Sequence, residues 1–93
     1  MSKSIMQDEK ECFVTGTVRN LDMHHCFHGS RRKAADKWGC WCWLNHDVHM
    51  ELHSRNTALD RQLKVECQRR FEALHGHQKF MEVFGKSYLE DNE

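Results

Sequence analysis

The sequence lacks proline altogether and contains five glycines in 93 residues. Without proline, the ending of helices and strands falls to glycine. A long hydrophobic run is missing as well, and no N-terminal apolar stretch resembles a signal peptide or a membrane span. We therefore expect a cytoplasmic protein with no membrane association.

Net charge of either sign is also missing, because 14 lysines and arginines balance 14 aspartates and glutamates. This balance argues against a generic cationic coat for nucleic acid. Acidic residues outnumber basic ones in residues 1–11 and 86–93, so the middle of the chain is basic. Its basic clusters contain Arg31, Arg32, Lys33 and Lys37, and further on Arg61, Lys64, Arg69 and Arg70. Each cluster is either a contact for phosphates or an acidic partner, or an ordinary solvated face.

A chain of this length forms one small domain with a modest apolar core. Hydrophobic residues make up 39% of it, five cysteines included, and its mean hydropathy is -0.84. Small domains of this kind often add a metal ion or disulfides for stability. An odd number of cysteines without a secretion signal disfavours disulfides, whereas eight histidines fit a metal.

The first half of the chain reads as short strands and loops. Two strands are expected at residues 12–14 and 17–21, with a turn between them. Residues 22–30 form a histidine-rich loop, and residues 31–37 a short helix that ends at a glycine. Residues 40–44 alternate cysteine and tryptophan, which indicates one further strand.

The second half of the chain reads as helical. Asn45 is a good N-cap for a helix that carries His49 and His53. A long amphipathic helix is expected at residues 57–75, and a short one at 78–84. The apolar stripe of the long helix has spacings of four, four, four and three, and consists of Leu59, Leu63, Cys67, Phe71 and Leu74.

The histidines have a spacing that suits a metal. His49 and His53 are four residues apart on the expected helix, so both imidazoles lie on one face. Two histidines placed in this way can chelate one ion, and a third from the tandem pair His24-His25 completes a three-ligand site. Such a site keeps an open position, as a catalytic metal requires. The sequence therefore predicts a metal-binding domain.

These features resemble the ββα-metal (HNH) nuclease finger, with the spacing of the colicin-type nucleases. Small phage-encoded HNH-like proteins share a cysteine-led hairpin, Leu-x-x-His-His-x-Phe, a Lys-Trp-Gly turn and a Leu-Asp-x-x-Leu-Lys helix. In this chain the last three are residues 21–27, 37–39 and 59–64. The resemblance implies an α+β fold, with a ββα-metal (HNH or treble-clef-like) finger and C-terminal helices. The single domain would span residues 11–89, between a flexible N-terminus at 1–10 and an acidic tail at 90–93.

The resemblance also implies a site. Its metal ligands would be His24, His49 and His53, and His25 would be the general base. Nitrogen ligands favour zinc (Zn2+), although other divalent transition metals also suit them. The activity implied is metal-dependent cleavage of DNA, in a phage-encoded protein of a bacterial cytoplasm. Phosphate or partner contacts would come from Arg31, Arg32, Lys33, Lys37, Arg61 and Lys64.

Two departures from the family pattern leave the activity open. Cys40 stands where the motif has its middle asparagine, although Asn45 lies close by. The cysteine knuckle of many relatives is broken, because Thr15 follows Cys12 at the spacing of the second cysteine. The alternative is a catalytically inactive metalloprotein that acts as a type II anti-CRISPR. It would bind the RNA-guided CRISPR nuclease and block guide or target-DNA loading.

Other histidines and cysteines have more than one interpretation each. His28 and His46 lie close to the predicted ligands and either contact substrate, fix the loop or face solvent. Cys12, Cys40 and Cys42 are either additional ligands or small buried side chains, and the second interpretation is the more common one.

Overall fold

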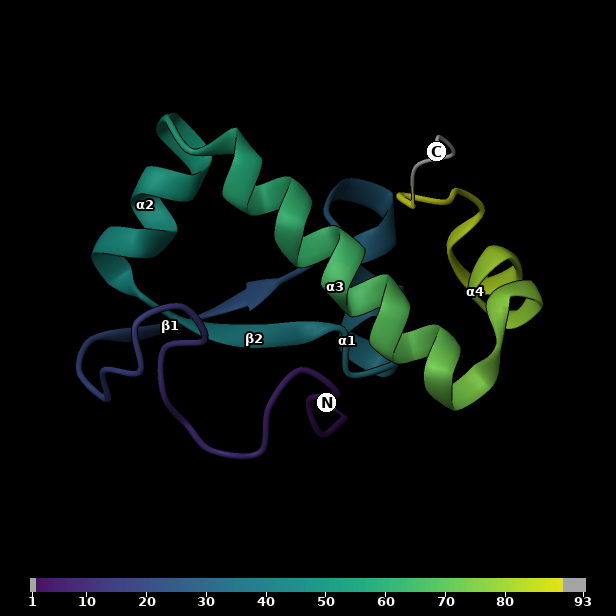
Figure 1. The fold of residues 1–93 in the computed structure, drawn as a ribbon, viewed down its shortest axis with the longest axis horizontal. Coiled ribbons are helices and arrows are strands. Elements are labelled where there is room, and N and C mark those ends of the chain that lie inside the picture. Colours follow the sequence, from purple (N-terminus) through teal and green to yellow (C-terminus); the bar gives the residue numbers. More distant parts are fainter. Residues whose placement is uncertain (1, 90–93) are drawn as a thin grey trace.

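Two short strands and four α-helices make up residues 2–89, the part of the chain that the computed structural model describes. The predicted acidic tail at 90–93 lies outside these residues. In chain order the elements are β1 (Leu21–His25), the 3-10 turn η1 (Gly29–Arg31), α1 (Arg32–Lys37), β2 (Trp41–Asn45), α2 (His46–Ser54), α3 (Thr57–His75) and α4 (His77–Phe84) (Figure 1). The predicted α+β class is confirmed at this level.

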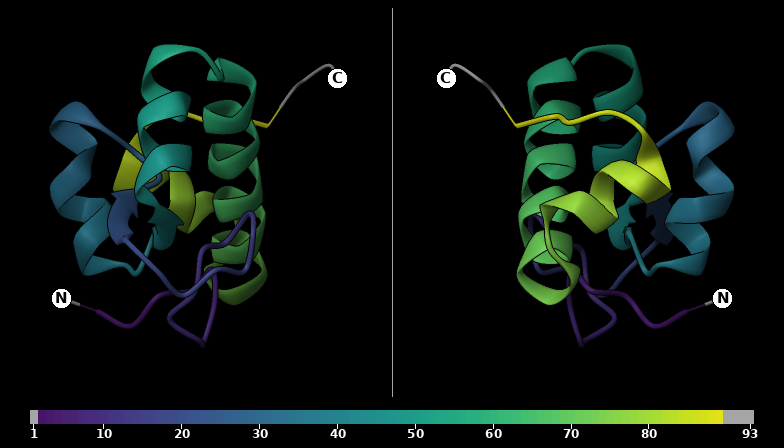
Figure 2. Two further views of the ribbon diagram at one scale, coloured as in Figure 1. Left: turned by 90° about the vertical axis from the view of Figure 1, so that its left-hand side faces the viewer. Right: turned by 90° about the vertical axis from the view of Figure 1, so that its right-hand side faces the viewer.

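The two strands pair antiparallel, in a register that runs from Leu21 opposite Asn45 to His25 opposite Trp41. His24 is opposite Cys42, so both side chains point to the same face of the sheet. Helix α1 lies on one side of the strands and α3 on the other (Figure 2). The sheet therefore separates two faces, each with its own helix.

The strands predicted at residues 12–14 and 17–21 are wrong. A tight turn occupies this segment, closed by the N–H of Cys12, which donates to the carbonyl of Thr17 at 2.7 Å. The turn uses backbone groups that strand pairing would need. The first strand instead begins at Leu21, the last residue of the predicted strand 17–21, and runs to His25 within the predicted histidine-rich loop of residues 22–30. The aspartate and histidines of this segment give it no strand-like pattern in the sequence. It forms a strand because β2 pairs with it.

The helices follow the sequence closely. Helix α3 spans Thr57–His75, as its apolar stripe predicts, and Gly76 ends it with a positive φ of 90°. Helix α2 begins directly after β2, where the side chain of Asn45 accepts a hydrogen bond from the N–H of Asp47 at 3.0 Å. Helix α4 starts one residue earlier than predicted. Within residues 2–89, none of the helices has the length and apolar character needed to cross a membrane.

An aromatic core joins the sheet to the C-terminal helices. Phe27, which follows β1, is fully buried, and its ring centroid lies 4.6 Å from that of Phe84 and 5.1 Å from that of Tyr88. Phe71 of α3 lies 5.4 Å from Phe80 of α4. Helix α3 crosses in front of the strands, and α4 lies beyond its C-terminal end (Figure 1). This packing fixes α3 over the face of the sheet that carries His24.

The N-terminal segment packs against β2, although the sequence indicates a flexible N-terminus at 1–10. The N–H of Ile5 donates to the carbonyl of Gly39 at 2.9 Å, and the N–H of Trp43 donates to the side chain of Gln7 at 2.7 Å. Met6 is buried in the core. These contacts were not evident from the polar composition of the segment, and its mobility stays a prediction.

Candidate metal centre

The structure brings His24, His49 and His53 together, although 24 residues separate the first two. Each offers one ring nitrogen, and these nitrogens lie within 4.8 Å of one another. The ring centroids of His24 and His49 are 5.2 Å apart, and the Nε2 atoms of His49 and His53 are 3.2 Å apart. The predicted ligand set thus exists as one cluster, which we call the three-histidine group.

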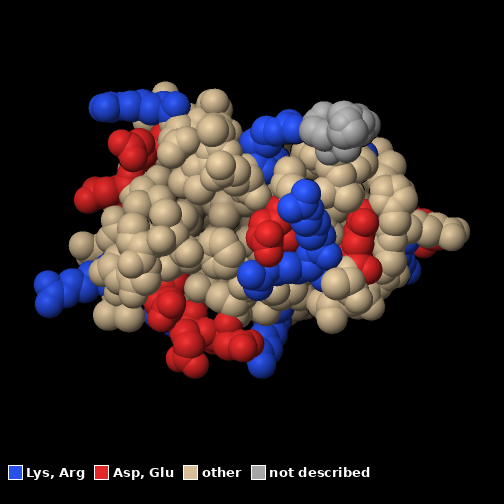
Figure 3. Space-filling model, in the orientation of Figure 1, with Lys and Arg blue, Asp and Glu red and all other residues tan. Residues whose placement is uncertain are grey.

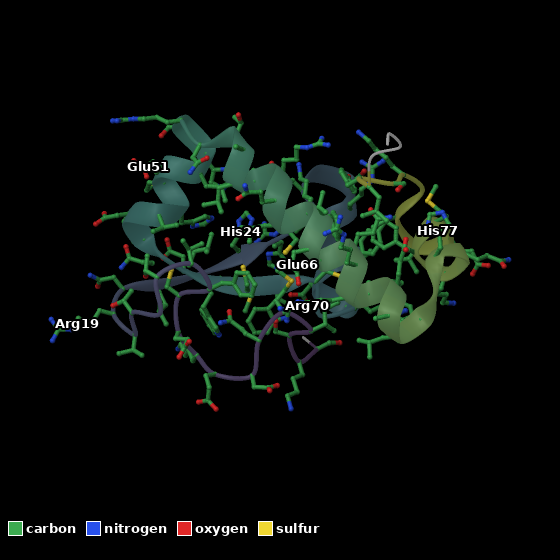
Figure 4. All side chains as sticks on the ribbon, in the orientation of Figure 1. Arg19, His24, Glu51, Glu66, Arg70 and His77 are labelled. Atoms are coloured by element: carbon green, nitrogen blue, oxygen red, sulfur yellow. The ribbon has the colours of Figure 1, made fainter. Side chains whose placement is uncertain are left out.

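Local structure explains this convergence. His24 lies on β1 and points to the face of the sheet beneath α2 and α3 (Figure 4). Helix α2 follows β2 without a loop, so its first turns start beside the neighbouring strand. Because His49 and His53 are one turn apart on α2, both face the same side of that helix.

His24 is the most unusual member of the group. It is 1% exposed, and its Nε2 has no hydrogen-bond partner among the described residues. An unpaired buried polar atom costs roughly 1 to 3 kcal/mol. Burial, together with the neighbouring His28 and His49, lowers the pKa of His24 to about 3. The ring is therefore neutral, with a buried nitrogen that lacks a hydrogen-bond partner within residues 2–89.

A carboxylate supports His49 from behind. Oδ2 of Asp22 lies 3.1 Å from Nδ1 of His49 and 2.8 Å from Nδ1 of His46. The hydrogen bond from His49 is the main cause that holds the pKa of Asp22 below its usual value, and the hydrogen bond from His46 is the next. At metal sites a carboxylate commonly orients a ligand histidine in this way, and leaves the other nitrogen free for the ion. His46 thus fixes the carboxylate and takes no place in the group.

The group fits a divalent transition metal. Zinc–nitrogen bonds of about 2.0 Å in a tetrahedral site place two ligand nitrogens about 3.3 Å apart. The 3.2 Å between the Nε2 atoms of His49 and His53 agrees with this spacing. An ion would also give the buried Nε2 of His24 the partner it lacks. The histidine-rich cluster can therefore hold a metal ion.

A second group of possible ligands adjoins the first and shares His24. It consists of His24, His28 and Asp60, again with one atom from each residue within 4.8 Å of the others. Nε2 of His28 lies 2.9 Å from Oδ1 of Asp60, in the first turn of α3. Sequence reasoning noticed His28 through its closeness to His24. It missed Asp60, which gives no signal apart from its place in the Leu-Asp-x-x-Leu-Lys motif.

His25 faces away from the three-histidine group. Successive side chains of a strand point to opposite faces, and the ring of His25 contacts α1. Its Nε2 lies 3.0 Å from Oδ1 of Asp36, and its side chain is 11% exposed. The hydrogen bond from His25 lowers the pKa of Asp36, so this carboxyl group is ionised at neutral pH. His25 and Asp36 line a shallow hollow together with Gly29, Arg32 and Lys33.

The first basic cluster is divided between different environments. Arg32 and Lys33 are exposed and border the hollow of His25. The Nε of Arg31 donates to the carbonyl of Phe84 at 2.9 Å, so this side chain ties η1 to the end of α4. Lys37 is exposed at the end of α1. Within this cluster, Arg32 and Lys33 are the side chains placed beside the predicted base.

The second basic cluster lies on α3. Lys64 forms an ion pair with Asp60 at 2.9 Å, and Arg61 is exposed. Basic and acidic side chains are interspersed on the face shown in Figure 3, without one broad basic surface. Binding of phosphate by either cluster stays a prediction.

The cysteines belong to the core. All five are buried and free: Cys12, Cys26, Cys40, Cys42 and Cys67. A hydrogen bond with Cys26, together with burial, raises the pKa of the Cys42 thiol far above its usual value. Metals bind thiolates, so this raised pKa disfavours ligation by Cys42. Among residues 2–89, both groups with metal-ligand spacing are built from histidine and aspartate, so Cys12, Cys40 and Cys42 are better interpreted as small core side chains.

Comparisons of the chain with protein-family models, curated proteins and solved structures return no match.

Proposed function

We propose that this chain is a metal-dependent DNA endonuclease of the HNH type, with zinc on His24, His49 and His53 and with His25 as the general base. It would be phage-encoded and act in the cytoplasm of a bacterial host. The observation that carries the proposal is that His24 and His25, neighbours on β1, have different surroundings. One ring joins the three-histidine group, and the other pairs with Asp36 beside two basic side chains.

The order of the elements supports a ββα-metal finger. An antiparallel pair, β1 and β2, is followed directly by α2, which carries two of the three ligands. The third ligand, His24, comes from β1. Helix α1 is inserted between the two strands, and α3 and α4 are the C-terminal helices of the proposed fold.

The chemistry assigns one role to each part of the site. When bound, a divalent ion would act as a Lewis acid for the negative charge that develops on a phosphodiester. His25 would take the proton of the attacking water as the water oxygen bonds to phosphorus and one P–O ester bond breaks. Because His24 and His25 point to opposite faces of β1, an edge strand of the two-stranded sheet, the phosphodiester would have to lie across the edge of that strand to reach both the ion and the base. Because Nε2 of His25 lies against Asp36, the proton would go to Nδ1. The ionised carboxylate of Asp36 would stabilise the imidazolium that results.

Asp36 would orient the base, the role that the middle asparagine of the HNH motif would otherwise have. Cys40, at the place of the middle asparagine, is fully buried, and its thiol lies in the core. Asp36 instead contacts the proposed base directly. Arg32 and Lys33 border the same hollow, where they would bind the phosphates that flank the scissile bond.

Plasmid cleavage tests the proposal. Supercoiled DNA is incubated with the protein and zinc, magnesium, manganese or nickel, beside His25→Ala and the control His77→Ala. His77 is an exposed histidine of α4 that also pairs with a carboxylate, that of Glu72. We expect nicking by wild type and by His77→Ala, and none by His25→Ala at unchanged zinc content. Equal cleavage by His25→Ala would contradict the role of the base.

The second candidate is the inactive type II anti-CRISPR protein. The observation in its favour is the burial of Cys40. A buried thiol at the place of the middle asparagine cannot supply the amide group of the HNH motif. Such a protein would keep the metal for folding and bind the RNA-guided nuclease through its charged surface. This candidate predicts no cleavage with any metal, zinc still bound, and a stoichiometric complex with a type II effector.

A further inference from the structure

His28 and Asp60 complete the surroundings of the three-histidine group. The ring centroid of His28 lies 5.3 Å from that of His24 and 5.8 Å from that of His53. Its ring thus borders two of the proposed ligands, one on β1 and one on α2. His28 precedes η1, and its side chain is 38% exposed.

The two groups of possible ligands fit one ion better than two. Both depend on His24, and Nε2 is the atom of His24 that is buried without a hydrogen-bond partner among the described residues. One nitrogen lone pair serves one metal ion. If that ion is bound by His24, His49 and His53, the ring of His28 is the further imidazole that borders this group.

Asp60 holds one ring nitrogen of His28 by a hydrogen bond, as Asp22 holds one of His49. Oδ1 of Asp60 lies 2.9 Å from Nε2 of His28, and its Oδ2 lies 2.9 Å from Nζ of Lys64. The carboxylate accepts from Nε2 of His28, as Asp22 accepts from Nδ1 of His49. In each pair one ring nitrogen is fixed by a carboxylate and the other is left with a lone pair.

We propose that His28 is a fourth ligand of the metal centre and that Asp60 orients it. This inference rests on the metal centre proposed above and holds for either candidate function. The resting ion would be enclosed by four imidazoles, from β1, the turn before η1, and α2. A carboxylate of α3 would hold the fourth one in place. In an active nuclease, a substrate phosphate would have to displace His28, the ligand that lies outside helix and strand.

Cobalt spectroscopy tests this assignment without any assay of activity. The metal-free protein is titrated with Co2+, whose visible absorption distinguishes a four-coordinate site from one with additional water. We expect an intense four-coordinate spectrum for wild type and for the control His77→Ala, and a weaker, shifted one for His28→Ala. In a competition assay, Asp60→Asn should lower zinc affinity about tenfold to a hundredfold. Lys64→Gln, which removes the ion pair but leaves the carboxylate, should not lower it.

A further variant gives a positive signal and guards against loss of folding. In His28→Cys a thiolate replaces the imidazole, so cobalt binding should add a sulfur-to-cobalt charge-transfer band in the near ultraviolet. Absence of that band, or wild-type spectra for His28→Ala and Asp60→Asn, would overturn the inference and leave the metal centre intact. Wild-type cobalt binding by His49→Ala would instead show that the metal centre itself is wrong.

Discussion

His24 and His25 are chemically identical neighbours, and the alternation of β1 gives them opposite environments. His24 is enclosed beneath α2 and α3, and its Nε2 lacks a partner in the part of the chain that the structure describes. His25 contacts Asp36 on α1. A buried neutral imidazole among other histidines is costly without a cation to bind. This cost makes His24 the residue on which the proposed metal site depends.

The pKa of His24 predicts how the metal-free protein responds to acid. In the folded chain the pKa is about 3, whereas an unfolded histidine titrates near 6.5. Below about pH 6.5 the unfolded chain therefore binds a proton that the folded chain does not. The free energy of unfolding should fall by up to about 1.4 kcal/mol per pH unit as the pH decreases from about 6.5 toward about 3. Urea denaturation with a chelator present, between about pH 7 and about pH 5, measures it.

The control for this prediction is His24→Leu, which removes the titrating ring. The groups that surround it, His28, His49, His53 and Asp60, titrate in both proteins and cancel in the comparison to first order. The pH dependence of His24→Leu should be shallower over this range. Equal slopes in the two proteins would mean that His24 is already protonated in the fold.

At the scale of elements, the helices were predictable and the first strand was not. The four-four-four-three spacing of the α3 stripe requires a helix whatever surrounds it, and the structure has one over the same residues. The sequence Leu-Asp-Met-His-His of β1 carries no such periodic signal. It becomes a strand because residues of β2, 20 positions further on, pair with it. Local patterns cannot contain that information.

The N-cap of α2 is the element-scale feature that most directly positions the site. Asn45→Ala removes the acceptor for the N–H of Asp47 and should cost about 1 kcal/mol of stability. Zinc affinity should fall with it, since His49 follows within one turn. Asn45→Asp keeps the acceptor but loses the donor to the carbonyl of Arg19, so it separates the two contacts. Chemical denaturation with and without zinc should rank the proteins wild type, Asn45→Asp, Asn45→Ala. Equal losses for both variants would contradict a role of the cap.

At the scale of the molecule, the grouping of His24, His49 and His53 was predictable, but the carboxylates that contact the histidines were not. The spacing of His49 and His53 and the resemblance to the HNH finger indicated the three-histidine group. The carboxylates of Asp22, Asp36 and Asp60 escaped notice because each contacts a histidine at least 11 positions away in sequence. Aspartates are common on surfaces, so only the folded chain shows which of them support a site.

The fold buries the cysteines in the core and gathers the histidines into a cluster of their own, although Cys42 is opposite His24 across the sheet. The five cysteines lie in the core between the sheet, α3 and the N-terminal segment, with their thiols buried. The histidines of the proposed centre converge on the side of the sheet beneath α2 and the start of α3. A metal bound by this protein should therefore be surrounded by nitrogen and not by sulfur.

X-ray absorption at the zinc edge tests this claim most directly. The sample is the protein stripped of metal and then loaded with one zinc per chain. We predict a first shell of nitrogen at about 2.0 Å with the outer-shell pattern of imidazole, and no sulfur at about 2.3 Å. A sulfur shell would place the metal on the cysteines, and a protein that takes up no zinc would have no metal centre; either result would contradict the account.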